Sequence, residues 1–354
     1  MLRPRLEWLL VFVPISLTSD LVVHNDLLTF FTSAAAILPL AGLIGRSTDQ
    51  LSLHAGPRIG GLLNATFGNI TELIISIFLI LQNELEIVKA SLTGSIIGNL
   101  LLVLGLSFFV GGLRNKEQEF SIDAAGVQTS SLALAVAGLV MPALFVLTTG
   151  QHDEAQREIV SVVIAAVLMA LYVCMLVFMY VTHRELFRTP HEDERPEWSV
   201  RRSVVTLIAV TTLVAVESEL LVAALEPALA DLGLSRLFVG LILVPIIGNA
   251  AEHSTAVMFA ARNKMDATLE IAIGSSLQIA LFVTPSLVFI SLALGHPMDF
   301  VFSPFEIAAV GISVLVVSLI SRDGRSNWLE GLQLIATYVI IAISFFFVRA
   351  LPNG

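Results

Sequence analysis

Eleven long apolar runs occupy most of this chain, and charged or Gly- and Pro-rich segments separate them. About 20 apolar residues in a helix cross the hydrocarbon core of a bilayer, and most of these runs reach or exceed that length. Only 14% of the residues are charged, against about 25% in soluble domains. We therefore predict an all-α integral membrane protein with about 11 transmembrane helices.

The predicted helices follow the apolar runs, and the first is interrupted by Pro14 and ends near Asp20. They cover residues 6–23, 27–45, 58–82, 87–112, 125–147, 157–182, 202–225, 236–261, 267–294, 303–321 and 329–350. The 19 Lys and Arg residues then lie on the side of the N-terminus, except Lys89, Arg157, Arg236 and Arg349. Because cytoplasmic loops carry the excess of basic residues, we predict a cytoplasmic N-terminus and an outside C-terminus.

One long loop, residues 183–201, is predicted on the cytoplasmic side and is rich in acidic residues. These are Glu185, Glu192, Asp193, Glu194 and Glu197. One interpretation is a solvated linker, because runs of charge are usually solvated. The other is a weak cytoplasmic cation sensor. The spacing is not that of an EF-hand loop, so no high-affinity calcium site is predicted there.

An internal repeat appears when the chain is shifted by 180 residues. Gly68-Asn69-Ile70-Thr71-Glu72 then aligns with Gly248-Asn249-Ala250-Ala251-Glu252. Further aligned pairs are Gly60 with Gly240, Leu63 with Leu243, Asn83 with Asn263, Gly94-Ser95 with Gly274-Ser275, and Leu101 with Leu281. The polar and glycine positions keep their register while the apolar residues differ.

The two copies of this motif lie on the third and eighth predicted spans, so they cross the membrane in opposite directions. Inverted repeats of this kind place their binding site near the bilayer midplane, between the two halves. We predict two inverted five-helix repeats, at 26–182 and 202–354. An extra N-terminal transmembrane helix, at 1–25, precedes them, and the acidic linker, at 183–201, joins them.

Each repeat carries one carboxylate near the predicted bilayer centre. Glu72 lies about 14 residues and Glu252 about 16 residues into its span, at about 1.5 Å per residue. A charged carboxylate there costs about 2.5–3.5 kcal/mol on insertion scales. Two opposed carboxylates repel, so one must be protonated or both must share a cation. Ca2+ and protons would then compete for the oxygens of this pair, as an exchanger requires. The alternative is a carboxyl pair that shares a proton and only holds helices together.

Amide side chains accompany both carboxylates. Asn69 and Asn249 precede their glutamates by three residues and share a helix face with them. Ca2+ takes 6–8 oxygen ligands from carboxylates, amide or backbone carbonyls and water. Gly68 and Gly248 are expected to loosen the helix or to allow close helix packing. Pro245 predicts a helix break in the second copy.

The following spans carry polar stripes that we also regard as candidate ligands. Ser91, Ser95 and Asn99 recur every four residues in the fourth span. Glu270, Gly274 and Gln278 recur likewise in the ninth span, beside Ser275. Small and polar residues also simply pack membrane helices, and this alternative applies most to Ser91 and Ser275. Buried amides are costlier to leave unpaired, which favours a binding role for Asn99 and Gln278.

Two further residues are secondary candidates. His253 is the only histidine well inside a span; a lone histidine is usually a packed, hydrogen-bonded residue, and proton handling is the alternative. Glu219 and Glu217 lie in the outer half of the seventh span and point to different faces, and Glu219 is a candidate for lining an outer vestibule. We identify no zinc site and no hydrolase constellation in the spans.

The motifs GNITELIISIF and GNAAEHSTAVMFA resemble the two signature repeats of the Ca2+/H+ antiporters of the CAX family, within the cation/Ca2+ exchanger superfamily. The resemblance covers essentially the whole chain and implies an eleven-span plan. It implies that Glu72 and Glu252 alternately bind Ca2+ and H+. It also implies that Asn69, Ser95, Asn99, Asn249, Ser275 and Gln278 are ligand or gate positions. Na+/Ca2+ exchangers match less well, because Thr71 and Ala251 stand before the glutamates.

The expected function is secondary antiport that exports cytosolic Ca2+ with proton influx by alternating access. Na+, K+ or Mn2+ exchange for H+ on the same scaffold is the alternative, and a passive cation channel is a further one. No enzyme activity and no cofactor are expected, and the partners are the lipid bilayer, Ca2+ and H+. The low net basicity argues against nucleic acid. The sequence leaves open the oligomeric state, including a homo-oligomer. The expected location is a prokaryotic plasma membrane, with a vacuolar membrane as the alternative.

Overall fold

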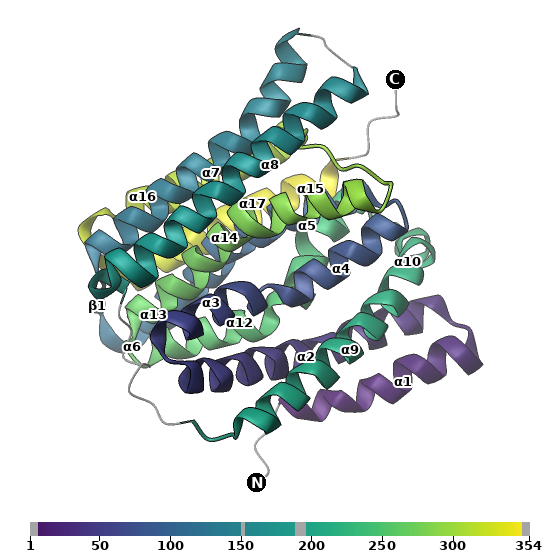
Figure 1. The fold of residues 1–354 in the computed structure, drawn as a ribbon, viewed down its shortest axis with the longest axis horizontal. Helices are drawn as coiled ribbons and strands as arrows, with labels where there is room; N and C mark the ends of the chain where they lie inside the picture. Colours follow the sequence, from purple (N-terminus) through teal and green to yellow (C-terminus); the bar gives the residue numbers. More distant parts are fainter. Residues whose placement is uncertain (1–5, 150–152, 188–195, 349–354) are drawn as a thin grey trace. The chain divides into compact units, whose positions relative to one another are not determined.

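The computed structural model describes residues 6–149, 153–187 and 196–348 (Figure 1). These residues contain 11 helices that are long and apolar enough to cross a membrane. They run over Leu6–Val23, Asp26–Ala55, Ile59–Leu81, Leu85–Asn115, Ile122–Thr148, Glu154–Thr182, Val200–Ala223, Arg236–Ala261, Met265–Ala293, Pro304–Asp323 and Trp328–Phe347. Each coincides with one predicted span, so the prediction of a multi-pass helical membrane protein is confirmed.

Most spans consist of several helical segments. The label η marks 3-10 helices (η1, η5 and η10) and π-helical turns (η2, η3, η4, η7, η8 and η9). The first six spans contain η1 (Leu6–Val11), α1 (Phe12–Thr18), η2 (Ser19–Val23), α2 (Asp26–Ala55), α3 (Pro57–Phe67), α4 (Ile70–Leu81), α5 (Leu85–Ile97), η3 (Gly98–Val103), α6 (Leu104–Asn115), α7 (Ile122–Thr149), α8 (Glu154–Val177) and η4 (Phe178–Thr182). The last five contain α9 (Val200–Ala223), α11 (Arg236–Phe238), η7 (Val239–Leu243), α12 (Val244–Ala261), α13 (Met265–Leu269), η8 (Glu270–Gly274), α14 (Ser275–Gln278), η9 (Ile279–Val283), α15 (Thr284–Ala293), α16 (Pro304–Ile320) and α17 (Trp328–Phe347). Shorter elements are η5 (Arg184–Phe187), α10 (Leu225–Leu232), η10 (Ser321–Asp323), β1 (Glu117–Glu119) and β2 (Arg325–Asn327).

The second span is longer than predicted, because α2 continues from residue 45 to Ala55. The polar residues after position 45 suggested a loop, but tertiary contacts keep them helical. Gln50 Oε1 accepts hydrogen bonds from the backbone N–H groups of Glu197 (2.7 Å) and Trp198 (2.9 Å), just before α9. The helix ends where Gly56 adopts a φ of 78°, which a glycine tolerates without strain.

The chain divides into two compact units, and each contains parts of both predicted repeats. The first unit comprises residues 1–88, 190–252 and 348–354. Within it α2 packs along α9, and α1, α3 and α10 also pack on α2 (Figure 1). Its buried apolar cluster consists of Leu40, Ile44, Leu207, Val210 and Val214. This packing joins the second and seventh spans, which are equivalent positions of the two repeats.

The second unit comprises residues 89–189 and 253–347. Within it α6 packs on α17, α8 packs on α15, and α7 packs on α16. The first two contacts pair the fourth span with the eleventh, and the sixth with the ninth. When each span is replaced by its equivalent in the other repeat, the contact of the fourth span with the eleventh becomes the contact of the ninth with the sixth. The contact of the fifth span with the tenth, α7 with α16, becomes itself. The packing is therefore what two equivalent halves of five helices would produce, while the repeat boundaries stay a prediction.

The backbone also repeats at the end of the motif helices. Asn83 after α4 and Asn263 after α12 both adopt a left-handed conformation with a φ of 61°. The backbone N–H groups of Asn83 and Asn263 donate to the carbonyls of Ile80 (2.9 Å) and Ala260 (3.0 Å), respectively. The next amides, of Glu84 and Lys264, donate to Leu79 (2.8 Å) and Phe259 (3.0 Å). Such paired bonds end a helix with a left-handed residue, usually Gly or Asn. The sequence repeat is therefore also a repeat of local structure.

Two short strands were not predicted. β1 and β2 pair antiparallel, with Gln118 opposite Ser326. Gln118 is buried and donates to the carbonyl of Ala260 and to Asn263 Oδ1, both at 2.8 Å. Three-residue strands carry too little sequence pattern to predict. Their pairing depends on contacts between loops that are far apart in the chain.

Only part of the predicted acidic linker is described. Glu192, Asp193 and Glu194 lie outside the described residues. Glu185 belongs to η5, and Glu197 Oε2 pairs with Arg46 at 3.1 Å. Both partners of that ion pair are substantially exposed, so the pair adds little stability.

Candidate cation-binding site

Glu72 stands at a break in the third span. α3 ends at Phe67, α4 begins at Ile70, and Gly68 and Asn69 form a turn between them. The prediction that Gly68 loosens the helix is thus confirmed. Glu72 occupies the first turn of α4 and is only 7% exposed. The free N–H groups and the positive dipole end at this position stabilise a negative charge.

The second copy of the motif has a different backbone. α12 runs without interruption through Gly248, Asn249 and Glu252, so the expectation that Gly248 loosens the helix is wrong. The irregularity lies earlier, where the π-helical turn η7 ends immediately before the first turn of α12, which contains Pro245. Proline has no N–H and clashes with the carbonyl four residues back, and a wider turn accommodates both effects. Glu252 therefore lies in mid-helix and is partly buried.

The two copies meet inside the first unit. A Cβ placed on Gly248 would stand 3.2 Å from Cγ and 3.5 Å from Cδ of Glu72. The Glu72 carboxyl is also hydrogen-bonded to the side chain of Asn249 and lies close enough to Glu252 for the two charges to repel. Gly248 therefore serves close approach, which was the alternative interpretation of this glycine.

Each motif also carries a buried asparagine. Asn69 and Asn249 are each 1% exposed. Asn69 lies directly before α4, and its carbonyl accepts from the amide of Leu73 at 3.1 Å. Nδ2 of Asn249 donates to the carbonyl of Pro245 at 3.1 Å. Glu72, Glu252 and Asn249 bring together oxygen donors of the kind that a hard cation takes, and the repulsion between the two carboxylates also suits a shared proton.

The candidate ligands of the fourth and ninth spans lie together in the second unit. Ser95, Asn99 and Ser275 are buried, and Gln278 is partly buried. Asn99 belongs to η3, which packs against η8 and α14, and α14 runs from Ser275 to Gln278. The structure therefore brings the two polar stripes together, and each of them adjoins a π-helical turn. Such turns occur frequently at functional sites.

His253 contacts one of these candidate ligands. A hydrogen bond of 3.1 Å joins its Nε2 atom to Oδ1 of Asn99. The amide oxygen accepts, so the ring nitrogen that faces it carries the proton. The side chain is partly buried. This geometry fits a packed, hydrogen-bonded histidine, and a role in proton handling stays a prediction.

The comparison with known sequences decides the family. The family described as "Sodium/calcium exchanger protein" matches residues 25–181 and 202–347. This chain belongs to that exchanger family. The two matched segments correspond to the two predicted repeats, and the gap between them, residues 182–201, coincides with the acidic linker to within one residue. The chain is accordingly a transporter by family and not an enzyme.

Relatives of this exchanger cover almost its whole length. A protein of Synechocystis sp. named Ca(2+)/H(+) antiporter is 46% identical over 96% of this chain and 96% of the relative. The Ca(2+)/H(+) antiporter ChaA of Bacillus subtilis is 46% identical over 94% of this chain and 96% of its own. Among solved structures, native YfkE has a TM-score of 0.86 at 42% identity and covers 97% of this chain and 100% of that one.

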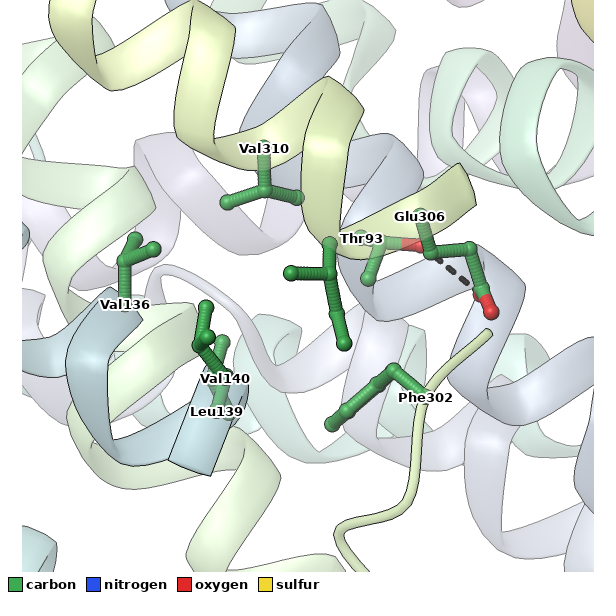
Figure 2. A pocket seen from close by; sticks show the side chains of 8 residues that line it. Thr93, Val136, Leu139, Val140, Phe302, Glu306 and Val310 are labelled. Atoms are coloured by element: carbon green, nitrogen blue, oxygen red, sulfur yellow. Dashed lines mark hydrogen bonds between the residues drawn. The ribbon is translucent and has the colours of Figure 1, made fainter. Parts of the chain in front are cut away.

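Two carboxyls of the exchanger that are not among the predicted cation ligands, those of Glu306 and Glu217, are buried. Glu306, in the first turn of α16, forms a capping box with Ser303 and is only 4% exposed. Its carboxyl accepts from Thr93 at 3.2 Å and borders a mostly apolar pocket (Figure 2). Glu217 is 0% exposed, whereas Glu219 is exposed. The two-residue spacing predicted different faces for them without showing which one is buried.

Proposed function

We propose that this exchanger exports cytosolic Ca2+ in exchange for protons, with Glu72 and Glu252 as the groups for which Ca2+ and H+ compete. The observation that supports this most directly is the contact of the two motifs in the first unit. Glu72 lies against Gly248, is hydrogen-bonded to Asn249 and lies close enough to Glu252 for the two negative charges to repel. The Ca(2+)/H(+) antiporter names of the relatives from Synechocystis sp. and B. subtilis support the same cargo.

The chemistry of the pair explains exchange without a cofactor. Two neighbouring carboxylates in a weakly polar medium cannot both stay charged without compensation. A divalent cation neutralises the pair when both are ionised, and protons neutralise it when the cation leaves. The two occupants therefore exclude each other, so cation release on one side requires proton uptake there. Alternating exposure of this pair to the two sides couples the fluxes.

The remaining ligands and the direction of transport belong to the same proposal. Asn249 supplies an amide group next to Glu72, and Asn69, Ser95, Asn99, Ser275 and Gln278 stay further ligand positions predicted from the sequence. The excess of basic residues on one side supports a cytoplasmic N-terminus. The bacterial sources of two relatives support a prokaryotic plasma membrane. Export then runs from the cytoplasm outward, driven by inward proton flow.

Reconstituted liposomes test the proposal. The purified protein is inserted, a pH gradient is imposed, and uptake of radioactive Ca2+ is measured for the wild type, Glu72→Gln and Glu252→Gln. We expect uptake that needs the gradient and is lost in both variants. Glu154→Gln is the matched control, because the Glu154 side chain is 93% exposed. Gradient-driven proton movement with Na+, K+ or Mn2+ but none with Ca2+ would refute the Ca2+ assignment. Ca2+ flux that persists without a gradient in both variants would refute exchange at this pair.

A further inference from the structure

A second buried carboxyl, which exchange at the Glu72 and Glu252 pair does not use, lies among the first, second and seventh spans. Glu217 on α9 is 0% exposed and lies within the first unit. Its Oε1 atom accepts a hydrogen bond from the hydroxyl of Ser16 at 2.9 Å. The hydroxyl of Ser33 on α2 also lies beside the carboxyl. The second oxygen, Oε2, has no hydrogen bond of normal geometry.

No positive charge compensates this carboxyl. Among residues 6–149, 153–187 and 196–348, Glu217 forms no ion pair. Burial of an ionised carboxylate without a partner costs far more than burial of the neutral acid, so the group binds a proton instead. Two hydroxyls are suitable partners for a neutral acid, because a hydroxyl both donates and accepts.

In the described part of the chain, the charged groups on the elements packed against α9 are not among the groups found against Glu217. α1 carries no titratable side chain. α2 begins with Asp26, seven residues before Ser33, and its Arg46, Asp49 and His54 lie at least thirteen residues after Ser33. α4 carries Glu72 in its first turn, and α10 carries Glu226 and Asp231, beyond the end of α9. The polar groups found against Glu217 are the hydroxyls of Ser16 and Ser33.

Buried hydroxyls lead from this carboxyl towards the turn between the first two spans. Ser19 lies three residues after Ser16, and Thr29 lies four residues before Ser33, so each pair shares a helix face. Thr29 Oγ1 donates to Ser19 Oγ at 2.9 Å, and Ser19 Oγ donates to the carbonyl of Asn25 at 3.2 Å. All four hydroxyl residues are at most 2% exposed. We call Ser16, Ser19, Thr29 and Ser33 the hydroxyl seam.

The seam ends at titratable, solvent-facing groups. Asn25 and the neighbouring His24 and Asp26 are exposed, and Asp20 is partly exposed. His24 holds a left-handed conformation with a φ of 53° at this turn. These exposed side chains place this end of the seam beside the solution.

We propose that Glu217 is a proton-binding site separate from Glu72 and Glu252, and that it exchanges its proton with the solution along the hydroxyl seam. The ligand is the proton itself, held as a neutral carboxylic acid between α1, α2 and α9. This proposal is independent of the transported cation, because it concerns a group that contacts neither motif glutamate in the described contacts.

Infrared difference spectroscopy of the purified full-length protein tests the protonation. The wild type at neutral pH is expected to show a carboxylic-acid C=O stretching band that Glu217→Gln loses. The matched control, Glu219→Gln, changes an exposed carboxyl two residues away and is expected to leave that band unchanged. Ser16→Ala removes the donor to Oε1 and is expected to shift the band to higher frequency. A carboxylate band in place of the acid band, removed by Glu217→Gln, would overturn the proposal.

Hydrogen–deuterium exchange of the same band tests the route. Transfer of the wild type to heavy water converts the acid to its deuterated form and shifts the band. The double variant Ser19→Ala/Thr29→Val breaks the seam and is expected to slow that shift. Thr212→Val is the control, because Thr212 is an exposed hydroxyl residue on α9 whose own bond runs to the carbonyl of Ile208. An unchanged exchange rate in the double variant would overturn the route.

Discussion

Glu72 packs directly on the backbone of Gly248, so that a Cβ at position 248 would lie 3.2 Å from Cγ of Glu72. The motif glycine of one repeat thus makes room for the motif carboxylate of the other. Any side chain at position 248 must displace Glu72 from its present position. This relationship makes the glycine part of the geometry of the carboxylate pair.

Gly248→Ala is predicted to weaken Ca2+ transport by displacing Glu72. Overpacking of this kind costs typically about 1–3 kcal/mol. Where this cost falls on the Ca2+-bound form, it raises KM for Ca2+ by about 5- to 150-fold. Liposome uptake at several Ca2+ concentrations measures it. Gly126→Ala is the control, because a Cβ there meets nothing within 4 Å. An unchanged KM in Gly248→Ala would contradict the predicted role of this contact.

Asn249→Leu is predicted to lower Ca2+ affinity, because it removes the hydrogen bond to Glu72 and one predicted oxygen ligand. Loss of such a supporting group typically costs about 10–100-fold in metal affinity. Calorimetric titration of the detergent-solubilised protein with Ca2+ measures it. Asn115→Leu is closely matched, because Asn115 Nδ2 also donates to the carbonyl four residues earlier, at 3.2 Å. Equal losses in both variants would show a general effect of removing an amide.

The two left-handed asparagines are predicted to respond differently to glycine. Asn83→Gly keeps the backbone conformation, so its melting temperature should stay close to that of the wild type. Asn263→Gly also keeps the conformation but removes the acceptor of the Gln118 bond, at 2.8 Å. Gln118 keeps its bond to the carbonyl of Ala260, but its second N–H group is left without this acceptor, which costs about 1–3 kcal/mol, so this variant should melt at a lower temperature. Equal melting temperatures would contradict this assignment.

The stability of the wild type is predicted to fall with rising pH because of Glu84, which lies in the loop between the third and fourth spans. Burial raises the pKa of Glu84 above its ordinary value of 4.5, although Arg236, 3.6 Å away, opposes the shift. A raised pKa stabilises the fold at low pH, and that stabilisation is lost as the pH rises from 4.5 through the raised value. Melting temperatures of Glu84→Gln and wild type should therefore diverge in favour of Glu84→Gln across that window. A difference that is constant with pH would refute this prediction.

Several features followed from local pattern alone. The apolar runs predicted every span, because a helix that faces lipid must be apolar over its whole length. The motif repeat predicted that Asn83 and Asn263 are equivalent, and both adopt the same φ of 61°. The interruption of the third span at Gly68 and Asn69 was also expected from the first motif, and Asn69 is the residue that leaves the helical conformation there. Each of these properties depends on residues that are neighbours in the chain.

Other features depended on contacts between distant segments. The extension of α2 to Ala55 depends on Gln50 and the segment before α9. At Gly248, within the uninterrupted α12, the close approach is to Glu72, which lies on a span far away in the sequence.

By itself the sequence determined the number of spans, the repeat and the two carboxylates, because lipid imposes a length and a hydropathy that can be read locally. Only the tertiary structure decided that Glu217 is buried while Glu219 is exposed. It also decided that Glu72 lies on Gly248. An α-helix in a membrane is apolar on most faces, so its sequence does not show which face meets protein and which meets lipid.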